Sequence, residues 1–176
     1  QEINSLTIDI PCTIEIYQDT SSRYGFVDVL AQRNVADNIE IRTADSNASF
    51  SFKKCFKSHN DITLKFNIPQ LSSLQVNSAS ELYSKRILLS DEFDLVLNES
   101  VSGHVVLQTE ELHTRVNSTA NIYLEGYTPY HKVYIQSAGV CNAFDLITDS
   151  TRVEITGSGQ ADIYIDKVAD IYTDGG

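Results

Sequence analysis

The C-terminal part of the chain repeats a short pattern about every twenty residues. An apolar residue followed by a polar or small one recurs at intervals of 21, 19, 19 and 20 residues. The five copies begin at Val76, Leu97, Val116, Ile135 and Ile155. A unit this short cannot bury its own apolar face, so it must stack on its neighbours to build a shared core. The repeat therefore predicts a solenoid.

Alternation of apolar and polar residues within each unit indicates β-strands. An apolar residue two positions before the anchor, such as Leu74 or Leu95, is present in four of the five copies. We therefore predict an all-β fold, a solenoid of short strands with coils of roughly 20 residues. A β-sandwich built from hairpins remains the alternative, because its strands show the same local alternation.

Residues 1–70 lack the regular interval but also show short alternating runs, such as Ile62, Leu64 and Phe66. Clusters of Asp, Asn and Ser separate these runs, as expected for turns between strands. We predict that residues 1–70 form a strand region that caps or continues the solenoid. Residues 71–176 form its repeats, and the two parts make one structural domain.

The chain carries a net charge of -11, from 24 acidic and 13 basic residues among 176. Such a field repels phosphate backbones, so nucleic acid is not an expected partner. No stretch of 18 apolar residues predicts a membrane span. The first residue is Gln1 and Met is absent, which favours a mature, exported protein. No pattern predicts a cofactor or a metal site.

Residues 71–82 resemble the L-x-x-L-x-L-S-G-A-S-D-V module of a bacterial family, the putative auto-transporter adhesins with a head GIN domain. Residues 153–163 are similar to the last copy of that module, and the similarity spans essentially the whole chain. The glycine of the module is kept only around Gly157 and Gly159. The other copies have Ser78, Glu99, Ser118 and Ser137 at this position.

The resemblance implies a right-handed β-helix-like fold in a bacterial protein of the Bacteroidetes type. It also implies export, either to the cell envelope as a lipoprotein or by secretion. The adhesin label implies binding of glycans or surface proteins at the cell surface. The family supplies no catalytic residues that could be carried over to this chain.

One polar position follows the anchor in each copy. In a solenoid these side chains stack one strand apart, about 4.8 Å, and amides can then hydrogen-bond from coil to coil. We predict a structural ladder of Asn77, Asn98, Asn117, Gln136 and Thr156.

Residues 123–134 contain four of the nine tyrosines. Exposed aromatic rings on a rigid coil stack on sugar faces or fill pockets of a protein partner. The predicted ligand-binding residues are Tyr123, Tyr127, Tyr130, His131 and Tyr134. Ordinary packing at a coil corner would explain these rings equally simply.

The sequence predicts a binding module rather than an enzyme. The four histidines lie in unrelated contexts, and no Gly-x-Ser-x-Gly nucleophile pattern occurs. Two alternatives remain. The first is a polysaccharide lyase or glycoside hydrolase, since acidic β-helices offer many carboxylate pairs. The second is a purely structural protein that forms homo-oligomers through the open edges of its solenoid.

The three cysteines, Cys12, Cys55 and Cys141, have no metal-site spacing. At most one disulfide can form, and we expect it between Cys12 and Cys55. Cys141 lies between apolar positions, which predicts a buried thiol.

Overall fold

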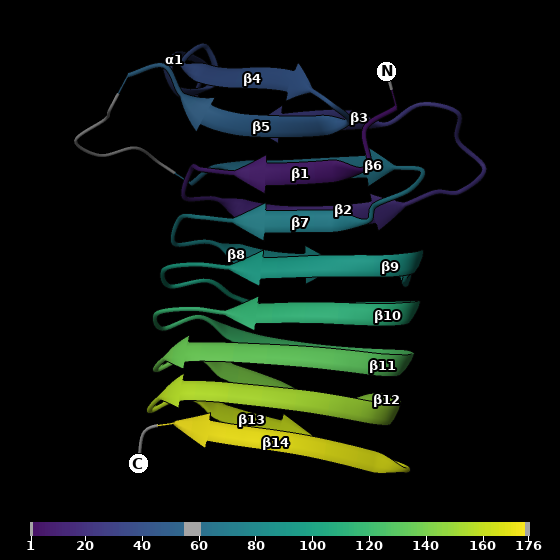
Figure 1. Ribbon diagram of the computed structural model, residues 1–176. Helices are drawn as coiled ribbons and strands as arrows, with labels where there is room; N and C mark the ends of the chain where they lie inside the picture. Colours follow the sequence, from purple (N-terminus) through teal and green to yellow (C-terminus); the bar gives the residue numbers. More distant parts are fainter. Residues whose placement is uncertain (1, 55–60, 175–176) are drawn as a thin grey trace.

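The chain winds into a β-solenoid in a computed structural model that describes residues 2–54 and 61–174 (Figure 1). Fourteen strands join one sheet, and within the described residues the only helix is the single turn α1 (Arg33–Ala36). The predicted all-β solenoid is confirmed. No helix in the described ranges is both long and apolar enough to cross a bilayer.

Each coil has two arms that face each other across the core, a first arm and a second arm, joined by a bend. First arms are β2 (Thr13–Gln18), β6 (Thr63–Ile68), β8 (Glu81–Ser84), β13 (Gln160–Ile163) and the starts of β10 (Ser102–Val116), β11 (Asn121–Ser137) and β12 (Val140–Gly157). Second arms are β1 (Ser5–Ile8), β5 (Asn47–Phe52), β7 (Ser73–Val76), β9 (Leu88–Leu97), β14 (Val168–Asp174) and the ends of β10 to β12.

Parallel pairing brings the five anchors of the repeat into one column along the solenoid axis. Val76 pairs with Leu97, and Leu97 pairs in turn with Val116. Val116 pairs with Ile135, and Ile135 with Ile155. This is the stacking predicted from the intervals of the repeat. The hairpin sandwich is wrong for residues 71–174, because all strand pairs there are parallel.

Three strands are much longer than the short strands expected, with 15 residues in β10, 17 in β11 and 18 in β12. They continue through the bend because a buried threonine satisfies backbone groups there. Thr109 and Thr128 each donate a hydrogen bond of 3.0 Å to the carbonyl two residues ahead. The Thr148 hydroxyl donates a hydrogen bond of 2.9 Å to the Tyr164 carbonyl on the next coil. The bend therefore needs no loop.

Residues 1–70 join the same stack. β1 pairs with β7 and β2 pairs with β8, both in parallel. β3 (Phe26–Leu30) and β4 (Ile39–Ala44) instead run antiparallel to β6 and β5, at the N-terminal end of the solenoid (Figure 1).

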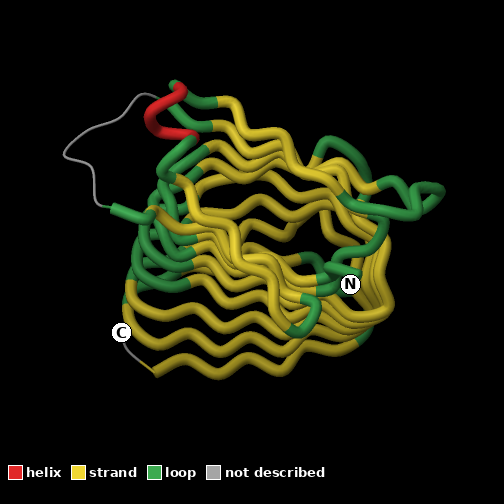
Figure 2. Tube along the Cα trace, turned by 90° about the horizontal axis from the view of Figure 1, so that it is seen from above, coloured by secondary structure: helices red, strands yellow, loops and turns green. Residues whose placement is uncertain are grey.

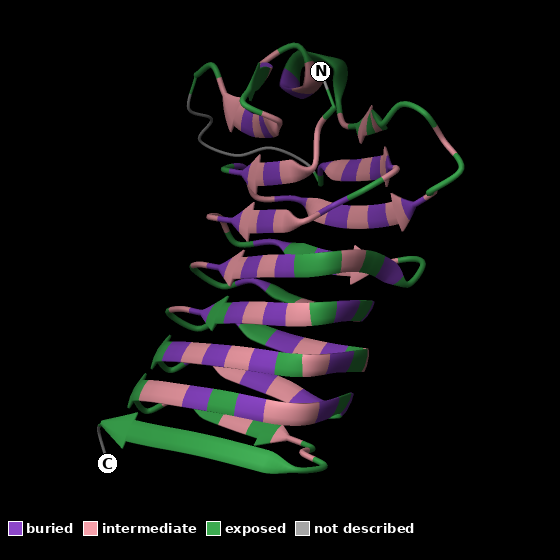
Figure 3. Ribbon diagram, turned by 45° about the vertical axis from the view of Figure 1, so that its right-hand side comes forward, coloured by how far each residue is buried: buried purple, intermediate pink, exposed green. Residues whose placement is uncertain are grey.

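The core is a continuous column of side chains between the two arms. Along the strands inside the stack, such as β2 and β6, buried and accessible residues alternate, which is the expected period of two (Figure 3). β14, in the last coil, is exposed along its whole length because no further strand covers it in the described chain.

The asparagine ladder forms in part. Asn98 donates to the Asn77 side-chain oxygen at 2.7 Å, and Asn117 donates to that of Asn98 at 2.7 Å. The Asn77 side-chain nitrogen in turn donates to the Asp9 carboxylate at 2.6 Å. Gln136 and Thr156 keep their places in the register but are exposed, and among the described residues neither joins the amide chain.

The left-handed corner after the ladder survives the loss of glycine in three of the four copies that lack it, and Ser78 is the exception. Glu99, Ser118 and Ser137 all have positive φ angles, of 58°, 57° and 68°. Gly157 has a φ of 105° at the same repeat position. The left-handed corner is thus imposed by the stack, even on residues that adopt it at a cost.

Cys12 and Cys141 are buried free thiols. Burial raises the pKa of each to about 12, so both remain protonated and unreactive. Cys55, the expected disulfide partner of Cys12, lies outside the described residues.

Candidate functional site

The tyrosines of residues 123–134 do not form a single cluster. Tyr123 lies on the first arm of β11, Tyr127 at the bend, and Tyr130 and Tyr134 on the second arm. Tyr127 is 40% exposed and Tyr130 59%. Ile147, which pairs with Tyr127 on the next coil, is also exposed. We call Tyr127, Tyr130 and Ile147 the corner patch.

Tyr123 belongs to a separate polar network on the first arm. Its hydroxyl donates a hydrogen bond to the Asp145 carboxylate. Its ring meets the edge of the His104 ring, with centroids 4.8 Å apart. His104 in turn lies 3.1 Å from the Glu125 carboxylate. Tyr123 therefore lies on the first arm, before the bend that carries Tyr127.

His131 does not belong to any exposed surface, which corrects the expectation that it binds ligand beside the tyrosines. It is 1% exposed and shares the inward parity of Val133 and Ile135. Its Nε2 lies 3.0 Å from the Thr114 hydroxyl, and its Nδ1 finds no partner among the described residues. The period of two along β11 was the signal that could have placed it inside.

The chemistry of the His131 ring follows from this burial. Desolvation lowers its pKa to about 3, and the proximity of His113 contributes in the same direction. His131 is therefore a neutral core residue at physiological pH.

The outer face of the second arms carries an ionic network that the sequence reading missed. His113 Nδ1 lies 3.0 Å from Asp94 Oδ1, and His113 Nε2 lies 2.8 Å from Glu111 Oε1. Lys132 Nζ lies 2.6 Å from the same Glu111 oxygen. Asp94, His113 and Lys132 are cross-strand neighbours on three successive coils. Their spacing of 19 residues, equal to the repeat, was the available signal.

This network shifts the pKa of two of its members, Glu111 and Lys132. Hydrogen bonds from Lys132 and His113 lower the pKa of Glu111, and Glu111 raises the pKa of Lys132. These side chains are substantially exposed, so the ion pairs organise the surface more than they stabilise the fold. Nearby, the Arg115 guanidinium lies 5.7 Å from the centre of the Tyr134 ring, in the range of a cation–π contact.

A cavity of about 470 Å³ opens at the N-terminal end of the solenoid, which Figure 2 views from above. It lies between β3 and β6 on one side and β1, β4 and β5 on the other. Its buried lining includes Leu6, Phe50 and Phe66, and its exposed lining includes Phe26 and Ile41. Arg23 and Glu2 supply charged groups to an otherwise mostly apolar wall.

The sequence of this chain also matches the model of a protein family. The model of the family described as "Putative auto-transporter adhesin, head GIN domain" matches residues 6–176. The chain belongs to this family. A search of curated proteins gives no match to this head GIN domain.

Solved structures share its fold. A putative adhesin from Bacteroides fragilis superposes with a TM-score of 0.85 at 14% identity, over 99% of this chain and 90% of the other. A putative adhesin from Parabacteroides distasonis gives 0.76 at 16% identity, over 100% and 91%. A protein named as a putative lipid binding protein from the same organism gives 0.71 at 14% identity, over 99% and 83%. At these identities the likeness concerns the fold alone.

The buried His131 predicts an acid-sensitive stability. Its folded pKa of about 3 lies below the ordinary value of 6.5, so below pH 6.5 the unfolded chain binds a proton that the folded chain rejects. Between pH 7.5 and pH 5, wild type should lose about 2 kcal/mol of unfolding free energy relative to His131→Leu. Urea unfolding at several pH values measures this difference. Equal pH slopes for the two proteins would contradict the burial of a neutral ring.

Proposed function

We propose that the chain is a non-catalytic binding module, exported and exposed at the bacterial surface, and that it binds glycans through the corner patch. Membership of an adhesin family supports a role in attachment. The exposure of Tyr127 at the bend and of Tyr130 at the start of the second arm carries the proposal. Two accessible rings offer flat apolar faces for sugar rings, and tyrosine loses little side-chain entropy on binding.

The backbone beneath the patch is held on both sides. Tyr127 is paired with Gln108 on one coil and with Ile147 on the next. Tyr130 is likewise paired with Glu111 and Ser150. A patch built on paired strands needs no ordering when it binds, which favours affinity.

The ionic state of the neighbouring carboxylate favours binding over hydrolysis. A glycosidase acid needs a pKa raised toward neutrality so that it holds a proton to donate. Glu111 is next to Tyr130 in the register, and its pKa is lowered by Lys132 and His113. It is therefore ionised and poorly suited to act as the acid.

A glycan array tests the proposed ligand class. Wild type should bind a defined set of glycans, and the Tyr127→Ala, Tyr130→Ala double variant should bind them at least tenfold more weakly, because each ring removes apolar surface from water on binding, at about 25 cal/mol per Å². Tyr24→Ala is the matched control, since Tyr24 is 72% exposed but lies outside the patch. Absence of glycan binding by wild type, or equal binding by the double variant, would contradict the proposal.

A second candidate function is the binding of an apolar chain in the N-terminal cavity. Its size lies within the range of ordinary ligand sites, and Phe26, Ile41 and Phe66 give it an apolar wall. Arg23 at the same cavity suits an anionic head group. One structural neighbour is named a putative lipid binding protein, which agrees with this candidate.

Calorimetric titration with laurate tests the second candidate. Each buried methylene contributes about 0.8 kcal/mol, so wild type should bind measurably. Ile41→Asp should weaken binding at least tenfold by placing a carboxylate in the apolar wall. Leu89→Asp is the control, because Leu89 is a similarly exposed apolar residue away from the cavity. No laurate binding, or equal weakening by the control, would exclude this function.

A further inference from the structure

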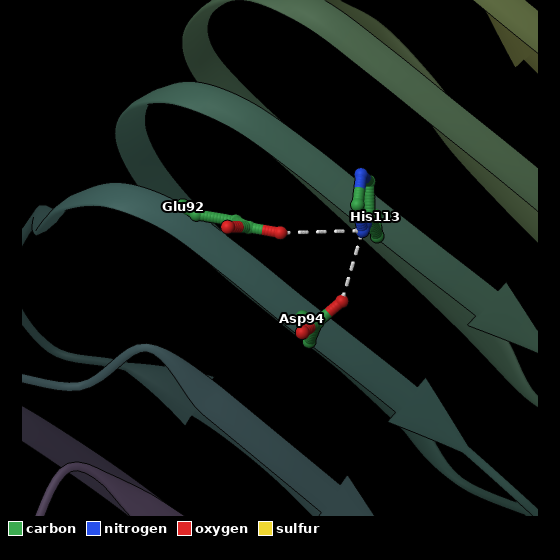
Figure 4. Close-up of side chains that lie close together, drawn as sticks. All are labelled: Glu92, Asp94 and His113. Carbon is green, nitrogen blue, oxygen red and sulfur yellow. Dashed lines mark hydrogen bonds and ion pairs between the residues drawn. The ribbon is translucent and has the colours of Figure 1, made fainter.

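We propose that Glu92, Asp94 and His113 form a binding site for a divalent transition metal of the zinc class. The three side chains lie on the outer face of β9 and β10 and point toward one another (Figure 4). His113 Nδ1 lies 3.0 Å from Asp94 Oδ1 and 3.8 Å from Glu92 Oε1. All three ligand atoms lie within 4.8 Å of one another.

These distances suit a small tetrahedral ion. Bonds of about 2.0 to 2.2 Å to nitrogen and oxygen place tetrahedral ligand atoms roughly 3.4 Å apart. The two measured separations from His113 lie on either side of that value. The Glu92 side chain is 61% exposed, so it can move toward the other two ligands without disturbing the core.

The strand register holds the ligands in place. Asp94 and His113 are direct cross-strand partners, and Glu92 lies two residues before Asp94 on the same face of β9. Ligands on paired strands are positioned more accurately than ligands on loops. The site therefore needs only side-chain adjustment to accept an ion.

A second observation concerns the other nitrogen of the His113 ring. Metal-bound histidines almost always donate their free N–H to a carboxylate or carbonyl, which orients the ring and selects the tautomer. His113 Nε2 lies 2.8 Å from Glu111 Oε1, and Lys132 holds that same oxygen at 2.6 Å. Glu111 and Lys132 thus orient Nδ1 toward Asp94 and Glu92. They are positioning residues for the site.

The charge balance also favours a cation on the Nδ1 side. In the described chain the ion pairs of Glu92 and Asp94 are made with His113 alone. The ligand oxygens of the Glu92 and Asp94 carboxylates lie within 4.8 Å of each other. The two carboxylates therefore repel each other, and a doubly charged ion would neutralise both. Lys132 lies on β11, on the far side of His113 from β9, so its charge does not occupy the proposed position.

The mixed ligand set selects the class of metal. Imidazole nitrogen favours zinc, copper, iron and nickel, whereas calcium and magnesium prefer sites made of oxygen alone. Three protein ligands leave at least one coordination position, which is open to solvent on this exposed face. We therefore expect Zn²⁺ to bind more tightly than Ca²⁺.

Calorimetric titration of the full chain with Zn²⁺ tests the site. Wild type should bind one ion at this site, and Asp94→Asn and His113→Gln should each weaken binding at least tenfold. Glu111→Gln should weaken it less, and the circular dichroism of each variant should match that of wild type. Ca²⁺ should bind at least tenfold more weakly than Zn²⁺.

His104→Gln is the matched control. His104, like His113, lies beside a carboxylate, Glu125 at 3.1 Å, but it lies outside the proposed ligand set. Its substitution should leave the Zn²⁺ affinity unchanged. Absence of Zn²⁺ binding by wild type, unchanged affinity in Asp94→Asn and His113→Gln, or an equal loss in His104→Gln would overturn the proposal.

Discussion

Parallel hydrogen bonding between equivalent strands of successive coils is the interaction on which the rest of this structure depends. A coil of about twenty residues has no core of its own, and it becomes stable only when its neighbours cover its apolar residues. Once Val116 is aligned with Leu97 and Ile135, the register sets the cross-strand partners of the other residues of the strand and the face to which each side chain points. The ladder, the corners and the surface networks all follow from that alignment.

The same alignment determines which residues become neighbours on the surface. Residues 19 apart on an outward position become neighbours, so Asp94, His113 and Lys132 meet across three coils although no local motif joins them. The two tyrosines of the corner patch owe their fixed spacing to the same paired backbone. The proposed glycan and metal sites therefore both rest on columns of residues that run along the solenoid axis.

The sequence was sufficient to predict the fold in the region where the repeat is regular. The anchors predict the register. The recurrence of asparagine after the anchor predicts the side-chain hydrogen bonds that join Asn77, Asn98 and Asn117. The direction of each side chain was harder to predict, because it depends on whether the residue takes an inward or an outward position along its strand. His131 was misplaced for that reason, and the continuous strands were missed because a buried threonine such as Thr128 resembles an ordinary turn residue. The network around His113 depends on contacts between coils, which no single unit reveals.

Methyl nuclear Overhauser spectroscopy of the labelled protein tests the stacking most directly. Adjacent strands lie about 4.8 Å apart, so the methyl groups of Val76 and Leu97, Leu97 and Val116, Val116 and Ile135, and Ile135 and Ile155 should give cross-peaks. Val76 and Ile155 are separated by four strand spacings, about 19 Å, and should give none. Missing cross-peaks between the consecutive pairs, or a direct contact between Val76 and Ile155, would contradict the solenoid.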